Sequence, residues 1–289
     1  MSYIWLRPKT ARCVLYSEFI KDILLDNTIR YNELMLLVID IGNTNTVIGL
    51  FDENKLIAHW RLASQRHRTA DEYGIIIKEF FILNNTDISE TTDVIISCVV
   101  PPLLPVLEEM SNKYFKINPL IVGPDTKTGL SILYDNPKDV GADRIANAVA
   151  GYEKFGGPLI IVDFGTAITF DVVSKKGEYL GGLIFPGITI SMEALFNKAA
   201  KLSRVELISP TAVIGKNTAE SVQAGAVYGY AGLVDNIVKE IQKETGKETK
   251  VISTGGQREL IAKHSSVIQE NCPLLTLEGL KIIYEKNKK

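Results

Sequence analysis

Neither sign of charge is in excess in this sequence of 289 residues: 32 Lys and Arg residues face 34 Asp and Glu residues, which gives a net charge of −2. Proteins that bind nucleic acid usually carry a basic excess, so the balance gives no indication of such a partner. Hydrophobic residues make up 46% of the chain. This content excludes a disordered protein, in which low hydrophobicity accompanies high net charge.

Cysteine and histidine are scarce. The cysteines lie far apart and form no Cys-x-x-Cys pair, so the sequence indicates neither a disulfide framework nor a zinc site; they are Cys13, Cys98 and Cys272. The histidines share no ligand spacing with cysteines or carboxylates; they are His59, His67 and His264. Such thiol usage is typical of a reducing compartment, and we expect a cytoplasmic protein.

Long hydrophobic runs are absent. No stretch reaches the roughly 18 apolar residues of a membrane span, so we expect no membrane partner. Residues 1–34 mix charges with a weak amphipathic pattern, and they lack the apolar core and cleavage site of a signal peptide. We expect them to form an extension outside the fold, with Met35 as a candidate for the true start. An additional helix is the alternative.

From Met35 onward, apolar strands alternate with helical patterns, which is typical of an α/β architecture. The pattern predicts strands over 36–41, 46–51, 56–62, 94–100, 120–122, 159–163, 167–173, 178–184 and 250–253. It predicts helices over 69–83, 103–114, 140–155, 187–200 and 218–245. The length is near the limit of about 250–300 residues for one hydrophobic core, so two domains are expected. No low-complexity linker separates them, which favours an extended interface.

The most informative feature is an internal repeat. Residues 38–46, VIDIGNTNT, resemble residues 161–169, IVDFGTAIT. Each copy is an apolar strand followed by Asp, one apolar residue, Gly, polar residues and a second strand. Asp40 and Asp163 lie 123 residues apart, which is about one domain length.

The residue types suit phosphate. Glycine permits a tight turn that brings backbone N–H groups close to an anion, and Asn and Thr add donors. A carboxylate repels phosphate but can hold a cation that phosphate also touches. Two ordinary hairpins are the alternative for one copy, but two copies and the glycine-rich turn at residues 253–256 favour a nucleotide clamp. The chain has no P-loop motif and no G-x-G-x-x-G after a strand.

The two hairpins and the late glycine turn resemble those of the acetate and sugar kinase, heat-shock and actin superfamily. Within it, the chain resembles the type III pantothenate kinases over residues 35–289; the matching stretches are DIGNTNTV (40–47), CVVPPL (98–103), GADR (141–144), DFGTA (163–167), GGLIFPG (181–187) and NTAESVQAG (217–225). The extension at residues 1–34 departs from the family pattern. The resemblance implies an α/β fold of two similar actin-like ATPase (ribonuclease H-like) domains, 35–154 and 155–289, with a nucleotide cleft between them.

Asp143 and Arg144 have a purely structural interpretation and a catalytic one. An acidic residue in the first helical turn suits the helix dipole, and the arginine could be a surface ion-pair partner. A kinase, however, needs a group that accepts the proton of the attacking hydroxyl, and an arginine binds an anionic substrate group. The resemblance implies that Asp143 is the proton acceptor and that pantothenate is bound by Gly141, Ala142, Asp143, Arg144, Tyr134 and Thr218. A core aromatic remains the alternative for Tyr134, and helix capping for Thr218.

The resemblance also implies the nucleotide and cation sites. ATP would contact Thr166 and the first hairpin, which comprises Asp40, Ile41, Gly42, Asn43, Thr44, Asn45, Thr46 and Val47. Asp163 would bind potassium or ammonium, Mg²⁺ would accompany ATP, and the protein would be a homodimer. For Arg61, Arg66 and Arg68, a solvated loop is favoured over a phosphate contact.

We therefore expect ATP-dependent phosphorylation of pantothenate to 4′-phosphopantothenate, the first step of coenzyme A biosynthesis. The alternatives are another small-alcohol kinase of the superfamily and a non-catalytic ATP-binding regulatory relative.

Overall fold

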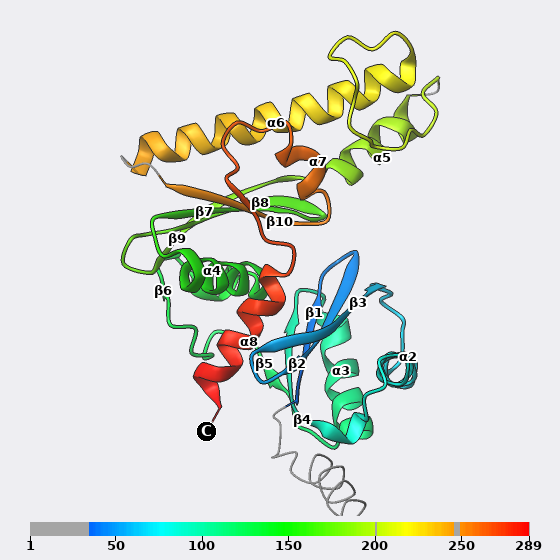
Figure 1. Ribbon diagram of the computed structural model, residues 1–289, viewed down its shortest axis with the longest axis vertical. Helices are drawn as coiled ribbons and strands as arrows, with labels where there is room; N and C mark the ends of the chain where they lie inside the picture. The colour runs from blue at the N-terminus through cyan, green and yellow to red at the C-terminus, as the bar shows by residue number, and fades with distance from the viewer. Residues whose placement is uncertain (1–34, 200, 246–248, 289) are drawn as a thin grey trace, which may run out of the picture.

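The computed structural model describes residues 35–199, 201–245 and 249–288, and it places two mixed sheets one above the other (Figure 1). The prediction for residues 1–34 lies outside the described residues. The first sheet contains β1 (Met35–Ile41), β2 (Asn45–Asp52), β3 (Lys55–Ala63), β4 (Thr91–Cys98) and β5 (Leu120–Ile121). The second contains β6 (Ser131–Ile132), β7 (Leu159–Phe164), β8 (Ala167–Val173), β9 (Glu178–Pro186), β10 (Lys250–Gly255) and β11 (Glu270–Asn271).

The strand order repeats between the sheets. The first runs β3-β2-β1-β4-β5, and the second runs β9-β8-β7-β10-β11 with β6 added beside β9. In both, three antiparallel strands are followed by a strand that is parallel to the first of them. The duplication seen in the sequence is therefore a duplication of topology, and the predicted α/β fold of two similar domains is confirmed.

Both central strands are buried because each has a neighbour on either side and helices on its faces. Residues 36–39 of β1 and 159–162 of β7 are almost inaccessible to solvent. Such continuous apolar runs are typical of strands that are covered on both faces. Each run ends at an aspartate near the carboxyl end of the strand, Asp40 in β1 and Asp163 in β7. The repeat thereby delivers one carboxylate from each sheet to the space between the domains.

Helices form the outer layers and a shared middle layer (Figure 1). On the outside, the first sheet is covered by α2 (Ala70–Leu83) and α3 (Leu104–Met110), and the second by α6 (Thr218–Thr245). The smaller α5 (Ile188–Lys198) and α7 (Arg258–Ala262) contact α6. Between the sheets lie α4 (Ala142–Phe155) and α8 (Leu275–Asn287), which pack on each other.

The two middle helices form a core that both domains share. Helix α4 contacts β7 and β8 of the second sheet and β4 of the first, and α8 contacts β1, β2 and β4 as well as α4. A Cβ on Gly279 of α8 would lie 1.9 Å from the carbonyl oxygen of Ala146, so the close crossing requires a glycine. Because α4 contacts the second sheet, the division into 35–154 and 155–289 stays a proposal.

Most predicted elements are present, with shifted ends. The helix predicted over 103–114 is α3 followed by a π-helical turn at Ser111–Phe115, and the helix predicted from residue 140 begins at Ala142. The predicted strand at 94–100 is β4, which ends at Cys98. Within the described part of the chain, every helix is too short or too polar to cross a bilayer.

Candidate active site

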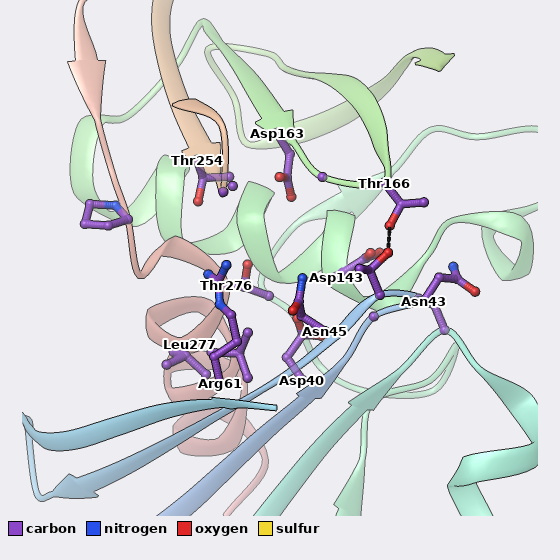
Figure 2. A pocket seen from close by; sticks show the side chains of 18 of the residues that line it. Asp40, Asn43, Asn45, Arg61, Asp143, Asp163, Thr166, Thr254, Thr276 and Leu277 are labelled. Carbon is purple, nitrogen blue, oxygen red and sulfur yellow. Dashed lines mark hydrogen bonds between the residues drawn. The ribbon is translucent and has the colours of Figure 1, made fainter. Parts of the chain in front are cut away.

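A cavity of about 530 Å³ lies where the three glycine turns meet between the sheets. The turns follow β1, β7 and β10, and the start of α4 and the start of α8 complete the walls (Figure 2). Its lining residues include Asp40, Gly42, Asn43, Thr44, Asn45, Val47, Arg61, Asp143, Arg144, Asp163, Thr166, Thr254, Gly255, Gly256 and Thr276. The structure thus brings the two hairpins, the late glycine turn and the GADR segment to one place.

The first hairpin lines the cavity with side chains, whereas part of its backbone is engaged in hydrogen bonds within the protein. The N–H of Gly42 donates to the carbonyl oxygen of Asn45 at 2.9 Å, which closes the turn. Ser64 braces it by donating its hydroxyl to the carbonyl oxygen of Gly42 at 2.7 Å. Thr46 and Ile41 are fully buried behind the lining. Phosphate donors must therefore come from the residues between Gly42 and Thr46.

The second hairpin mirrors the first. The N–H of Gly165 donates to the carbonyl oxygen of Ala167 at 3.1 Å. The hydroxyls of Thr166 and Thr44 lie 2.7 Å apart, so the two turns meet across the cavity (Figure 2). The two phosphate turns predicted from the repeat are therefore neighbours in space.

The third turn depends on the absence of a side chain. Gly255 has a φ of +89°, and a Cβ there would lie 2.4 Å from Oδ1 of Asp163. Arg258 stabilises the turn, because its Nη1 donates to the carbonyl oxygen of Gly255 at 2.8 Å. The N–H of Gly256 donates to the carbonyl oxygen of Phe164 at 3.0 Å. This tight contact fixes the glycine turn against the end of β7.

Three carboxylates from three elements face the cavity, and their charges repel (Figure 2). Burial raises the pKa of Asp40 to about 8, and the charge of Asp143 adds to the shift. Burial raises the pKa of Asp163 to about 7, again with a contribution from Asp143. Burial also raises the pKa of Asp143 itself. Nearby cations and hydrogen-bond donors would both stabilise the ionised form of these carboxylates.

Asp163 is oriented by a chain of hydrogen bonds that sequence reasoning missed. Nδ2 of Asn147 donates to Oδ2 of Asp163 at 2.9 Å, and Thr276 donates its hydroxyl to Oδ1 of Asn147 at 2.8 Å. Asn147 is fully buried in α4, and Thr276 lies in the first turn of α8. The amide therefore connects both middle helices to the carboxylate.

These carboxylates suit a magnesium ion that retains water and phosphate ligands. Oδ1 of Asp40 is buried and lacks a hydrogen-bond partner among the described residues. No group of three or more His, Cys, Asp or Glu side chains in the described ranges is close enough to hold a metal by itself. Mg²⁺ usually binds to one or two carboxylates together with substrate phosphates. The residues present fit that arrangement.

The GADR segment opens α4. Oδ1 of Asp143 accepts the N–H of Arg144 at 2.8 Å. Gly141 has an ordinary φ of −59°, but a Cβ at this position would lie 2.5 Å from Oδ1 of Asp143. Glycine is therefore required at this position because it leaves room for the carboxylate of Asp143, and not because the backbone conformation is unusual. Ala142 occupies the first helical position and is partly buried.

Arg144 is a buried residue, and the surface ion-pair interpretation is wrong. Its Nε lies 2.8 Å from Oδ1 of Asp171, and its side chain is 9% exposed. Burial lowers the pKa of the guanidinium, but the charges of Asp171 and Tyr179 and the hydrogen bond to Asp171 together outweigh burial, so the pKa of Arg144 is raised. Its Nη2 is buried without a partner among the described residues.

The other two residues predicted to contact the acceptor, Tyr134 and Thr218, lie in different parts of the structure. Tyr134 is partly buried, and its ring lies 6.4 Å from that of Tyr179 and near Gly181, on the Arg144 side of the second sheet. Thr218 lies apart from the cleft at the start of α6, in a second hollow that also contains Leu195. There Asn217 caps the helix by accepting the N–H of Glu220 at 2.9 Å, so the capping expected in this segment is made by the residue before Thr218.

The prediction that Arg61 belongs to a solvated basic loop is wrong. This residue belongs to β3, lines the cavity and lowers the pKa of Asp163. Arg68 lies 5.2 Å above the ring of Tyr73. Arg66 is exposed, as the solvated-loop interpretation expected. Strand alternation could not show that β3 turns Arg61 toward the other domain.

Comparisons with known proteins find similar sequences over most of the chain. The family profile described as Type III pantothenate kinase matches residues 36–240. The chain is similar to the type III pantothenate kinase of Geotalea daltonii, with 57% identity over 254 residues, 88% of this chain and 99% of that protein. It is 54% identical to that of Myxococcus xanthus over 253 residues, 88% of this chain and 99% of that protein. The corresponding protein of Bacillus cytotoxicus is 52% identical over 88% of this chain and 97% of its own length.

Among solved structures, similarity extends to the fold alone. A protein described as a Baf family transcriptional activator from Campylobacter jejuni has a TM-score of 0.54 and 22% identity, over 87% of this chain and 98% of that one. Ethanolamine utilization protein EutJ from Carboxydothermus hydrogenoformans has a TM-score of 0.51 and 13% identity, over 92% and 98% of the two chains.

Proposed function

The chain belongs to the type III pantothenate kinase family, and we propose that its central cavity transfers the γ-phosphoryl group of ATP to the hydroxyl of pantothenate. The product is 4′-phosphopantothenate, and the reaction is the first step of coenzyme A biosynthesis. The observation that carries the proposal is that two phosphate turns, a carboxylate at the start of α4 and an arginine with a free nitrogen line or border one cavity.

Asp143 is the proton acceptor in this proposal. A general base works best when its pKa approaches the operating pH, and burial raises the pKa of Asp143 in that direction. Gly141 leaves space for its carboxylate, and the N–H of Arg144 orients Oδ1. Arg144 follows in the sequence and offers Nη2 to the carboxylate of pantothenate. A base next to a cationic anchor supports the proposal of an acceptor that has a hydroxyl at one end and an anion at the other.

The two hairpins hold the phosphates. Asn43, Thr44 and Asn45 act from one side and Thr166 from the other, which favours an in-line arrangement of acceptor and γ-phosphate. Mg²⁺, when bound, would neutralise charge on the phosphates, and Asp40, whose Oδ1 is buried without a partner among the described residues, would hold it. Potassium or ammonium would bind near Asp163, which Asn147 orients. The glycine turn at Gly255 would take the adenine and ribose.

The active protein in this proposal is a cytoplasmic homodimer. Nine of the thirteen exposed large hydrophobic residues in the described part of the chain fall between Leu180 and Ile214, so the apolar surface is concentrated on β9, α5 and the loop after it. Thr218 lies in the adjacent hollow, outside the cavity of its own chain. A second copy packed on this surface would bring the predicted contact from Thr218 to an acceptor site.

The test is an acceptor panel with purified protein, in which ADP and phosphorylated product are both measured. We expect 4′-phosphopantothenate to form only when ATP and pantothenate are both present. Faster phosphorylation of another small alcohol would identify a different kinase of the superfamily. ATP binding without transfer to any acceptor would indicate a regulatory protein.

A further inference from the structure

A buried polar cluster lies behind Arg144, inside the second sheet. Asp171 belongs to β8 and is fully buried. Its Oδ1 accepts hydrogen bonds from Nε of Arg144 at 2.8 Å and from the hydroxyl of Tyr179 at 2.7 Å. Its Oδ2 accepts the hydroxyl of Thr169 at 3.1 Å. Both carboxylate oxygens are therefore engaged inside the cluster, and the group is buried away from the cavity surface.

The cluster fixes the guanidinium from two directions. Tyr179 of β9 is fully buried, and its ring lies 6.0 Å from Cζ of Arg144. A Cβ on Gly182, also in β9, would lie 1.7 Å from the carbonyl oxygen of Phe170 and 3.1 Å from Nη2 of Arg144. The absence of a side chain at Gly182 therefore lets the backbone of β9 pack close to Nη2 of Arg144, which is buried and has no hydrogen-bond partner among the described residues.

A buried ion pair is costly, because desolvation of both charges offsets much of their attraction. Well-packed apolar residues would stabilise a sheet interior at least as well. The pair of Arg144 and Asp171 leaves one donor, Nη2 of Arg144, without a partner among the described residues. A costly buried pair of this kind is explained if it orients that donor toward an anion of the ligand.

On the basis of the proposed function, we propose that Asp171 and Tyr179 are positioning residues. They hold Arg144 by Nε so that Nη2 receives the carboxylate of the acceptor, and they thereby select an anionic acceptor over a neutral analogue. Neither residue touches substrate, and both act through the arginine.

The chain offers a matched control on its surface. Asp71 accepts Nζ of Lys113 at 2.6 Å and the hydroxyl of Tyr114 at 2.8 Å, which is the same carboxylate–cation–tyrosine arrangement. Asp71 belongs to α2, and Lys113 and Tyr114 to the turn at Ser111–Phe115; the ion pair is exposed, and none of the three residues lines the cavity. The variants Asp71→Asn and Tyr114→Phe should leave acceptor selection unchanged.

The experiment compares kcat/KM for pantothenate with that for pantothenol, in which a neutral alcohol replaces the carboxylate. Asp171→Asn should raise the KM for pantothenate by about 10- to 100-fold, the usual effect of losing a hydrogen bond to a charged group. The KM for ATP and the kcat/KM for pantothenol should stay within about twofold of wild type, because neither depends on the carboxylate contact. Tyr179→Phe should change the ratio in the same direction, by about 3- to 10-fold.

The two proposals fail in different ways. A wild-type protein that forms no phosphopantothenate would overturn the proposed function. A wild-type protein that is active on pantothenate and equally active on pantothenol would overturn only the anchor and its positioning. Variants that lose both acceptors equally, or that raise the KM for ATP in parallel, would show that the cluster is merely structural. If Asp171→Asn does not fold, Tyr179→Phe decides alone, since it removes a single oxygen.

Discussion

The hydroxyls of Thr44 and Thr166 lie 2.7 Å apart although the residues are separated by 122 positions in the chain. Thr166 directly follows Gly165, whereas Thr44 is the second residue after Gly42, so the contact joins the two turns at neighbouring rather than equivalent positions of the repeat. The duplicated sequence thus becomes a pair of turns that meet at the centre of the cavity. A polyphosphate between the domains would contact both hydroxyls.

We expect Thr44→Val and Thr166→Val each to raise the KM for ATP by about 3- to 10-fold, because each removes one hydroxyl donor. The KM for pantothenate should change little. Steady-state kinetics with ATP varied would measure the effect. Thr92→Val is the control, since Thr92 donates to the carbonyl oxygen of Met35 outside the cavity. Unchanged ATP kinetics in both hairpin variants would contradict the assignment of the turns to phosphate.

Gly255→Ala should abolish ATP binding while leaving most of the fold intact. The φ of +89° is strained for alanine, and its Cβ would meet Oδ1 of Asp163 and the backbone of Phe164. Calorimetric titration with ATP and a thermal melt would separate the two effects. Gly225→Ala is the control, because a Cβ there meets nothing within 4 Å. Normal ATP affinity in Gly255→Ala would refute the role of this turn.

The sequence predicts the two glycine turns well because their signal is local, whereas their contact with phosphate stays a prediction. A buried strand, an aspartate, a glycine and polar residues follow one another in both copies, and hydrogen bonds inside each turn fix the geometry. Helix α8 was not predicted, although Leu277, Leu280 and Ile283 have helical spacing and are buried. Its position between the sheets depends on contacts with α4 and β1, more than 100 residues earlier.

The residues behind the site are harder to infer from sequence. Asp171 stands alone in the apolar strand of residues 167–173, and a lone carboxylate in such a run indicates a buried pair. Its partner Arg144 lies 27 residues earlier on a helix, so only the packing of α4 on the sheet identifies it. Asn147 resembles an ordinary helical residue until Thr276 and Asp163 are seen on either side of it.

Activity should depend on potassium or ammonium, and Asp163→Ala should weaken that dependence together with ATP turnover. Asp163 presents a buried carboxylate that is oriented by Asn147, and Arg61 is the nearby cation that lowers its pKa. Replacing potassium by sodium at constant ionic strength, with Mg²⁺ held fixed, would measure the requirement. Full activity of wild type in sodium alone would exclude a selective monovalent site.

Asp40 should make the ligand-free protein less stable as pH rises. Its pKa is about 8 in the folded chain and ordinarily 3.8, so between these values the unfolded chain is ionised while the folded one keeps the proton. The unfolded state then binds fewer protons, and the free energy of unfolding falls with pH. Asp40→Asn should therefore raise the melting temperature near pH 8 but not near pH 4, while abolishing activity.

Thermal melts of both proteins across this range, without nucleotide or Mg²⁺, would test the expectation. Asp71→Asn is the control of opposite sign, because hydrogen bonds from Lys113 and Tyr114 lower the pKa of Asp71. A stability difference between wild type and Asp40→Asn that is independent of pH would contradict the assigned shift.

Asp143→Asn and Gly141→Ala together test the proton acceptor. Asparagine keeps the shape and removes the basicity, so kcat should fall by about 10²- to 10⁴-fold, the usual contribution of general acid–base catalysis. Gly141→Ala leaves the backbone unstrained but displaces Oδ1 of Asp143, and it should lower kcat without changing the melting temperature greatly. ATP affinity should be nearly normal in both, since the phosphate turns are untouched.

If Asp143 serves only the helix dipole, Asp143→Asn instead costs about 0.3–1 kcal/mol of stability, with turnover close to wild type. Kinetics and a melt on the same samples distinguish these outcomes, and turnover within a few-fold of wild type in Asp143→Asn would remove this residue from the reaction.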